Sequence, residues 1–251
     1  MSNIAIATDS NSGMSLQTAK SLGISVVPMP FMINDNEYFE NVNLTQEEFY
    51  KLLAENANIC TSQPTPDTLC NLWDELLKDH DEVVYIPMSS GLSGSCQSAT
   101  VLAGEYDGRV QVVDNKRISV TLEQSCYDAL NLAKSGKSAL EIKNILEEDG
   151  ANSSIYIMLD TLYYLKKGGR ITPAAAAIGN LLKIKPVLQI QGDKLDAFAK
   201  ARTVSQGKNI MINAIKADIE KRFGNNPDDI FYMMAYTYDE EASNQFMEEA
   251  K

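Results

Sequence analysis

The run of small and hydroxyl-bearing residues at Ser89–Ser95 has the composition of an anion receptor. It lies between an expected strand at Glu82–Pro87 and an expected helix at Ser93–Ala103. Small residues let the backbone turn tightly, and the amide groups that begin a helix carry a partial positive charge. Serine hydroxyls add directed donors. The run can therefore bind one carboxylate or phosphate, although a serine-rich helix cap without any ligand has the same composition.

Two further segments carry residues of related chemistry. Thr61 and Ser62 stand in a proline-stiffened loop before an expected helix, where their hydroxyls are neutral donors. Taken alone, that loop fits an ordinary capped turn better than a binding site. Gly168-Gly169 permits a backbone conformation that other residues resist, and presents Arg170, whose planar guanidinium suits carboxylate or phosphate. A glycine helix stop followed by a surface arginine explains this segment equally well.

An enzymatic interpretation of the same serine run is also open. Gly91–Ser95 nearly matches the G-x-S-x-G nucleophile elbow, with Ser95 in place of the last glycine. Ser93 would then be the nucleophile of a serine hydrolase or acyltransferase, which is our alternative function. The only histidine, His80, lies in a polar connector and would have to reach Ser93. A regulatory sensor of another small anion is a third hypothesis.

Composition excludes several classes of function. The 251 residues include 22 basic and 34 acidic side chains, a formal net charge of −12, which disfavours nucleic-acid binding. One histidine and four cysteines without a C-x₂-C pair disfavour a metal site, and we expect reduced thiols and no cofactor. No uncharged apolar run has the ~20 residues of a membrane span, and the N-terminus does not resemble a signal peptide. We therefore expect a cytoplasmic protein without integral membrane association.

Charge is unevenly distributed along the chain. Lys166–Lys208 contains seven lysines, two arginines and two aspartates, a net charge of +7, so the remainder carries −19. A basic segment on an acidic protein can be a docking surface or an anion site. Solvated helix and hairpin faces would give the same count, so charge alone does not identify a partner.

The elements expected in the first half alternate between strands and helices. Strands are expected at Asn3–Thr8, Ile24–Ile33 (interrupted by Pro28 and Pro30), Glu82–Pro87 and Val110–Val113. Helices are expected at Ser15–Leu22, Thr45–Glu55, Thr65–Leu77, Ser93–Ala103, Ile118–Lys134 and Ala139–Glu148. This alternation predicts a mostly parallel α/β sheet, with ligands beyond the carboxyl ends of its strands. Asp9-Ser10 and the stretch after Pro87 lie at that edge.

The pattern changes after Asp149-Gly150. Strands are expected at Ser154–Leu159, Ile184–Gln191, Leu195–Ala199 and Ile230–Tyr236, with a hairpin turn at Gln191–Lys194. Helices are expected at Thr161–Lys167, Pro173–Leu182 and Thr203–Arg222, and from Asp239 onward. We therefore expect an N-terminal α/β domain at 1–150 and a C-terminal α+β domain at 151–251.

Five segments then occur together in a specific order. They are Asp9-Ser10, Thr61–Pro64, Pro87–Ser95, Asp160–Arg170 and Leu182–Pro186. This combination resembles the DegV family of bacterial fatty-acid-binding proteins over essentially the whole chain. The resemblance implies that one long-chain fatty acid is buried between two domains. It also implies a non-catalytic subunit that presents the fatty-acid carboxylate to a separate ATP-dependent fatty acid kinase subunit, which makes an acyl phosphate.

By motif position, the resemblance assigns roles to individual residues. Thr61 and Ser93 would hydrogen-bond the carboxylate, Ser62 and the amides near Gly94 would support them, and Arg170 would face the kinase or its phosphate. Burial of the acyl chain would contribute about 0.8 kcal/mol per methylene. Candidate linings are the apolar runs Ile24–Ile33, Ile155–Leu162 and Ala174–Leu188. Family members usually continue to a glycine-rich end with a histidine near the carboxylate, so we expect the second domain to be incomplete at its C-terminus.

Overall fold

The structure is a computed structural model that describes residues 3–39, 42–55, 57–178, 184–192, 194–224, 226–237 and 240–250. Contacts divide the chain into two compact units, Met1–Gly150 and Ala151–Lys251.

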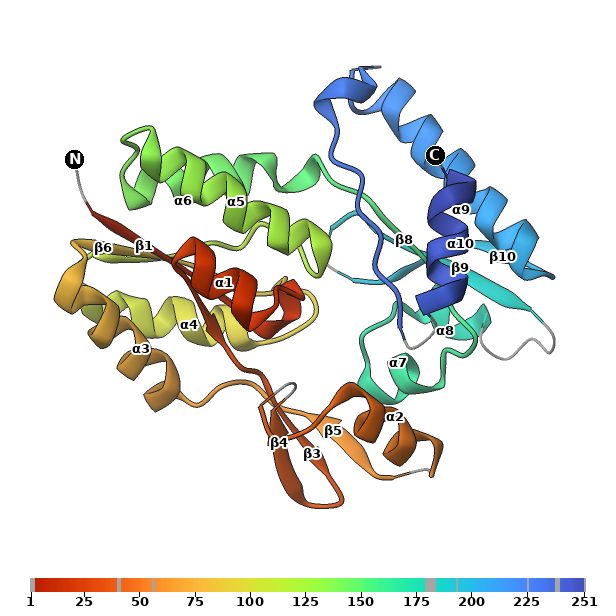
Figure 1. Cartoon of the computed structure of the whole chain (residues 1–251), viewed down its shortest axis with the longest axis horizontal. Helices are drawn as coiled ribbons and strands as arrows, with labels where there is room; N and C mark the ends of the chain where they lie inside the picture. The colour runs from red at the N-terminus through yellow and green to blue at the C-terminus, as the bar shows by residue number, and fades with distance from the viewer. Residues whose placement is uncertain are drawn as a thin grey trace. The chain divides into compact units, whose positions relative to one another are not determined.

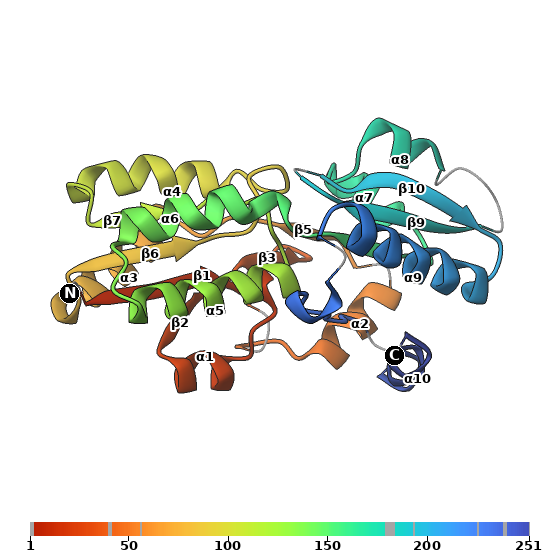
Figure 2. The same cartoon turned by 90° about the horizontal axis from the view of Figure 1, so that it is seen from above.

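A four-stranded parallel sheet forms the centre of the first unit (Figures 1 and 2). Its order is β2-β1-β6-β7, formed by Ile24–Val27, Ile4–Asp9, Glu82–Ile86 and Val110–Val112. Each neighbouring pair of strands is parallel, so all four carboxyl ends lie at one edge. The predicted parallel α/β sheet is confirmed.

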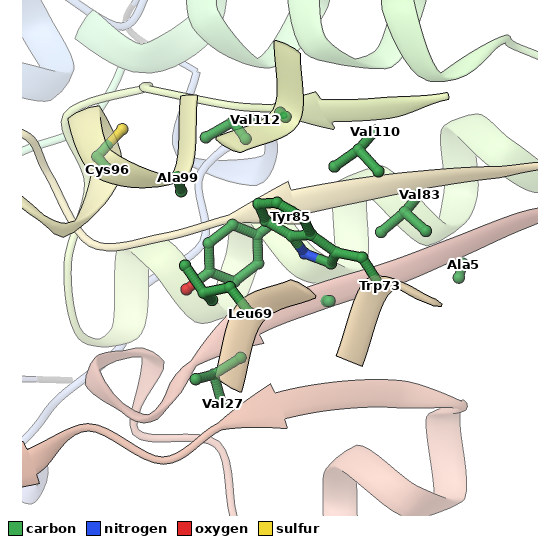
Figure 3. Packing of buried hydrophobic residues seen from close by; sticks show 12 residues of the cluster. Ala5, Val27, Leu69, Trp73, Val83, Tyr85, Cys96, Ala99, Val110 and Val112 are labelled. Atoms are coloured by element: carbon green, nitrogen blue, oxygen red, sulfur yellow. The ribbon is translucent and has the colours of Figure 1, made fainter. Parts of the chain in front are cut away.

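Helices cover both faces of this sheet. Helices α3 (Pro66–Asp79) and α4 (Ser95–Ala103) contact one face, and α5 (Val120–Lys134) and α6 (Ala139–Glu148) contact the other (Figure 1). Figure 3 shows the core beneath α3 and α4, where the Trp73 and Tyr85 rings pack edge to face with centroids 5.7 Å apart. Alternate residues of β6 therefore point toward this face of the sheet and pack against the start of α4.

Helix boundaries in this unit follow local capping chemistry. Ser15 caps α1 (Leu16–Leu22), and capping boxes begin α2 (Gln46–Ala54) at Thr45 and α6 at Ser138. These starts agree with the predicted ones. Helix α4 instead begins at Ser95, two residues later than expected. The reason is that Ser93 and Gly94 form the preceding turn, in which the amide of Ser95 donates to Ser93 Oγ at 3.2 Å.

A second, antiparallel sheet in the first unit was not predicted. Its order is β4-β3-β5, formed by Asn36–Phe39, Pro30–Ile33 and Ile59–Thr61. The expected run Ile24–Ile33 breaks near Pro28 and contributes to both sheets, as its prolines indicated. Asn34 and Asp35, with φ of 48° and 67°, make the tight turn into β4. The short sequences of β4 and β5 carry too little apolar periodicity to be recognised.

The second unit contains an antiparallel sheet of order β10-β9-β8. Its strands are β8 (Ile155–Met158), β9 (Lys185–Ile190) and β10 (Asp196–Ala201). Helix α9 (Val204–Lys221) contacts all three strands. The other helices are α7 (Tyr163–Gly168), α8 (Pro173–Ile178) and α10 (Glu240–Ala250). Short 3₁₀ turns occupy Ser10–Ser12, Gly104–Tyr106, Asp149–Ala151 and Pro227–Asp229.

The predicted antiparallel pairing of β9 with β10 is confirmed. Leu182 of the fifth motif, Asp193 of the hairpin turn and Asp239 lie outside the described residues.

The strand predicted at Ile230–Tyr236 is wrong. This segment has no regular secondary structure, and Phe231 is 74% and Tyr232 55% exposed. A strand is stabilised by cross-strand partners, which an apolar sequence cannot supply by itself. None of the described strands pairs with this run.

Gly150 gives a test of packing at the end of the first unit. A Cβ at Gly150 would stand 2.5 Å from the backbone oxygen of Asn115, whereas a Cβ at Gly104 would meet nothing within 4 Å. We expect Gly150→Ala to lower the free energy of unfolding by about 1–3 kcal/mol, because the backbone must shift. Gly104→Ala, the matched control, should leave it unchanged or raise it slightly. Urea unfolding followed by Trp73, the only tryptophan, measures both. Equal midpoints for wild type and Gly150→Ala would contradict this packing.

Candidate functional site

A buried carboxyl group fixes the ends of the two central strands. Asp9, the last residue of β1, is fully buried, and its Oδ2 accepts the amide of Met88, just after β6, at 2.9 Å. Its Oδ1 accepts the backbone and side-chain nitrogens of Asn11 at 2.9 and 3.0 Å. Burial raises the pKa of Asp9 above its ordinary value, against the effect of these hydrogen bonds. Asp9 thereby determines where the chain leaves β6.

The serine-rich segment then forms one tight turn before α4. The amides of Leu92 and Ser93 donate to the carbonyl oxygen of Ser89 at 3.0 and 3.2 Å, and the amide of Gly91 donates to Ser89 Oγ at 3.2 Å. Ser93 is half-buried and Gly94 is exposed. Gly94 is the N-cap of α4 and has no side chain to accept from the first-turn amides. The turn therefore presents a hydroxyl beside the positive end of a helix, which suits an anion.

The loop that carries Thr61 and Ser62 lies beside this turn. Gln63 Oε1 accepts the hydroxyl of Ser98 in α4 at 3.4 Å, and it lies 3.7 Å from the position that a Cβ at Gly94 would occupy. The amide of Ser62 donates to the carbonyl oxygen of Pro30 at 3.0 Å, which fixes the loop on the antiparallel sheet. The donor segments that contain Thr61 and Ser93, far apart in sequence, therefore meet at the start of α4.

Arg170 belongs to the second unit, whereas Thr61, Ser62, Ser93 and Gly94 belong to the first. Helix α7 ends at Gly168 and is capped by Gly169, whose φ is 70°, as the double glycine predicted. The amide of Arg170 donates to Leu165 and that of Gly169 to Lys166, both at 3.1 Å, which is a Schellman motif. Arg170 Nη1 donates to the carbonyl oxygen of Gly168 at 2.6 Å. The guanidinium is thus held on a defined turn.

A charged pair next to the serine turn was not predicted from the sequence. Asp114 Oδ1, just after β7, accepts the amide of Ser90 at 3.2 Å, and Lys116 Nζ lies 2.7 Å from Asp114 Oδ2 and contacts Ser90 Oγ. Burial alone would raise the pKa of Asp114, but hydrogen bonds from Lys116 and Ser90 hold it below its ordinary value. The sequence feature that could have indicated this pair is Asp114 itself, an acidic residue at the carboxyl end of another strand of the same sheet.

The geometry argues against Ser93 as the nucleophile of a hydrolase. His80 caps the C-terminus of α3, with Nδ1 2.9 Å from the carbonyl oxygen of Leu76, and precedes β6, whereas Ser93 follows β6. The five residues of β6 span about 16 Å, so the imidazole and the hydroxyl lie at opposite edges of the sheet. His80 therefore cannot serve as the general base for Ser93.

The four cysteines and the acidic residues are candidate nucleophiles and metal ligands. All four cysteines are free, and burial raises the pKa of both Cys96 and Cys126 to about 12, which disfavours the reactive thiolate. Among the described residues, no group of three or more histidine, cysteine, aspartate or glutamate side chains could hold a metal ion. In the same part of the chain, no helix combines the length and apolar character needed to cross a bilayer.

Comparison with known proteins identifies the family. Residues 3–251 match the family described as "Uncharacterised protein, DegV family". A DegV domain-containing protein of Staphylococcus aureus is 33% identical over 226 residues, which cover 90% of this chain and 80% of that protein.

Two solved structures share the fold. A fatty-acid-binding DegV family protein from Thermus thermophilus has a TM-score of 0.80 at 32% identity, over 88% of this chain and 79% of that one. DegV from Bacillus subtilis, a fatty-acid-binding protein, has a TM-score of 0.77 at 30% identity, again over 88% and 79%. With the family match over nearly all of its length, the chain belongs to the DegV family.

Proposed function

We propose that the protein binds one long-chain fatty acid in a tunnel between its two units and presents the carboxylate to a separate ATP-dependent kinase subunit. The observation that carries this proposal is the meeting of two neutral donor segments, joined through Gln63, at the start of α4. The fatty-acid-binding relatives from Thermus thermophilus and Bacillus subtilis support the choice of ligand. Because ATP is the second substrate, the protein would act in the cytoplasm.

The proposed site suits a carboxylate that must react. One carboxylate oxygen forms a bond to the γ-phosphorus of ATP, the bond from that phosphorus to the β,γ-bridging oxygen breaks, and ADP leaves. The acid is already ionised, so the step needs no general base from this chain. Thr61 and Ser93, supported by Ser62 and the amides near Gly94, hold the carboxylate with neutral donors. A paired cation would bind it more tightly and reduce its nucleophilicity.

The acyl chain requires an apolar lining. On β8, Tyr156 and Met158 face α9, because Tyr156 Oη donates to Asp218 at 2.7 Å and Met158 lies against Gly207. Ile155 and Ile157 therefore point to the opposite face of the sheet, where both are half-buried. They are our first candidates for the lining, and Ile24–Ile33 and Ala174–Leu188 are the others. Each buried methylene would contribute about 0.8 kcal/mol.

Substitution of the two hydroxyl donors tests carboxylate binding. We expect Thr61→Val and Ser93→Ala each to raise the dissociation constant for a C14–C18 fatty acid about tenfold or more, because each removes a hydrogen bond to a charged group. Ser135→Ala, at the far end of α5, is the matched control and should bind like wild type. Native mass spectrometry with added acid measures the bound fraction. A wild-type protein that binds no fatty acid would refute the proposed function.

Arg170→Gln separates binding from presentation. We expect this variant to bind fatty acid like wild type and to form acyl phosphate at least tenfold more slowly with the kinase subunit, because a bidentate cation for phosphate is lost. Arg202→Gln, an exposed arginine of the same basic segment, is the control for net charge. Single-turnover formation of acyl phosphate provides the measurement. Equal rates for the two variants would remove Arg170 from the proposal.

A further inference from the structure

The segment 113–119, which follows β7, contacts the first residues of the serine turn. The amide of Ser89 donates to the carbonyl oxygen of Arg117 at 2.9 Å, and the amide of Ser90 donates to Asp114 Oδ1 at 3.2 Å. At its other end, the amide of Ser119 donates to the carbonyl oxygen of Asn11 at 2.8 Å. The segment therefore connects the serine turn with the turn that follows Asp9.

The backbone of this segment is strained in two places. Lys116 and Ser119 adopt φ of 61° and 57°, in the left-handed region that side chains other than glycine disfavour. The surrounding contacts enforce this conformation, since Glu147 Oε1 also accepts the amide of Asp114 at 2.9 Å. Strained residues that neighbouring structure holds in place are characteristic of functional sites.

The strained conformation brings a cation to the serine turn. Lys116 Nζ contacts Ser90 Oγ and lies 2.7 Å from Asp114 Oδ2, with side chains 38% and 29% exposed. Ser90 and Ser93 belong to one turn, because the amide of Ser93 donates to Ser89. The ammonium group thus orients the turn, while the Asp114 carboxylate neutralises its charge.

We propose that Lys116 is a positioning residue for the carboxylate-binding turn, and that Asp114 keeps the bound carboxylate reactive by pairing with Lys116. This inference rests on the proposed function. An unpaired ammonium group beside the turn would attract the carboxylate and withdraw its electron density from the attacking oxygen. In the pair with Asp114, Lys116 still contacts Ser90 and orients the turn, but the positive charge of Lys116 is neutralised.

Variants at Lys116, Asp114 and Lys137 separate this role from a merely structural ion pair. Lys116→Met removes the contact with Ser90. Asp114→Asn keeps an oxygen that can accept the amide of Ser90 but removes the negative charge that lies 2.7 Å from the ammonium group. Lys137→Met is the matched control, because Lys137 pairs with Glu141 at 3.2 Å with comparable exposure. Lys137 precedes α6, whose Ala139 amide donates to Glu82 at the opposite edge of the sheet.

Each variant is measured with palmitate labelled with ¹³C at its carboxyl carbon. The readouts are the dissociation constant, the pH midpoint of the bound carboxyl carbon in NMR titration, and the rate of acyl phosphate formation at saturating palmitate. We expect Lys116→Met to raise the dissociation constant about tenfold and Lys116→Arg to restore most of the affinity. Asp114→Asn should lower the pH midpoint, tighten binding and slow phosphoryl transfer several-fold. Lys137→Met should match wild type in all three.

The outcomes distinguish this inference from the proposed function. A wild-type protein that binds no palmitate refutes both. Wild-type binding combined with Lys116→Met and Asp114→Asn values equal to those of Lys137→Met overturns the positioning role alone. If Lys116→Met does not fold, as judged by Trp73 fluorescence, the pH midpoint and rate of Asp114→Asn decide the question.

Discussion

The site depends on the hydrogen bond that the buried carboxyl group of Asp9 accepts from the amide of Met88. An ionised carboxylate is costly to bury unless hydrogen bonds compensate for lost water, and Asp9 obtains these from Met88 and Asn11. The bond to Met88 joins two residues that are 79 positions apart in sequence and lie at the ends of neighbouring strands. The serine turn begins at the next residue, so its position follows directly from this one buried group.

The parallel direction of the strands brings these groups together. Because β1, β6 and β7 run in the same direction, the segments that follow them meet at one edge. Asp9, the serine turn and the Asp114–Lys116 pair come from these three strand ends. Thr61 comes from a different source, the antiparallel sheet, and Gln63 links its loop to α4. The candidate site therefore combines an edge defined by topology with one loop that is positioned by specific side-chain contacts.

The sequence predicted those features whose causes are local. Capping boxes at Thr45 and Ser138 and the glycine stop at Gly169 depend on neighbouring residues, and each was recognised. The failures have nonlocal causes. Ile230–Tyr236 has the composition of a strand but lacks a described partner, and α4 starts late because Ser93 accepts the amide of Ser95. Lys116 was not predicted because its contact with Ser90 depends on a left-handed backbone conformation, which the residue type lysine does not indicate.

The distribution of charge gives the proposed site its chemical logic. An interaction accelerates phosphoryl transfer only if it is stronger in the transition state than in the bound reactants. A cation beside the bound carboxylate would attract it most strongly in the ground state. That attraction would weaken as the carboxylate oxygen bonds to phosphorus and loses negative charge, so the cation would oppose the reaction. Neutral hydroxyls and amides, with Lys116 paired to Asp114, avoid this loss. Positive charge is useful instead on the transferring phosphate, and in the proposed reaction it comes from Arg170 and from the kinase subunit.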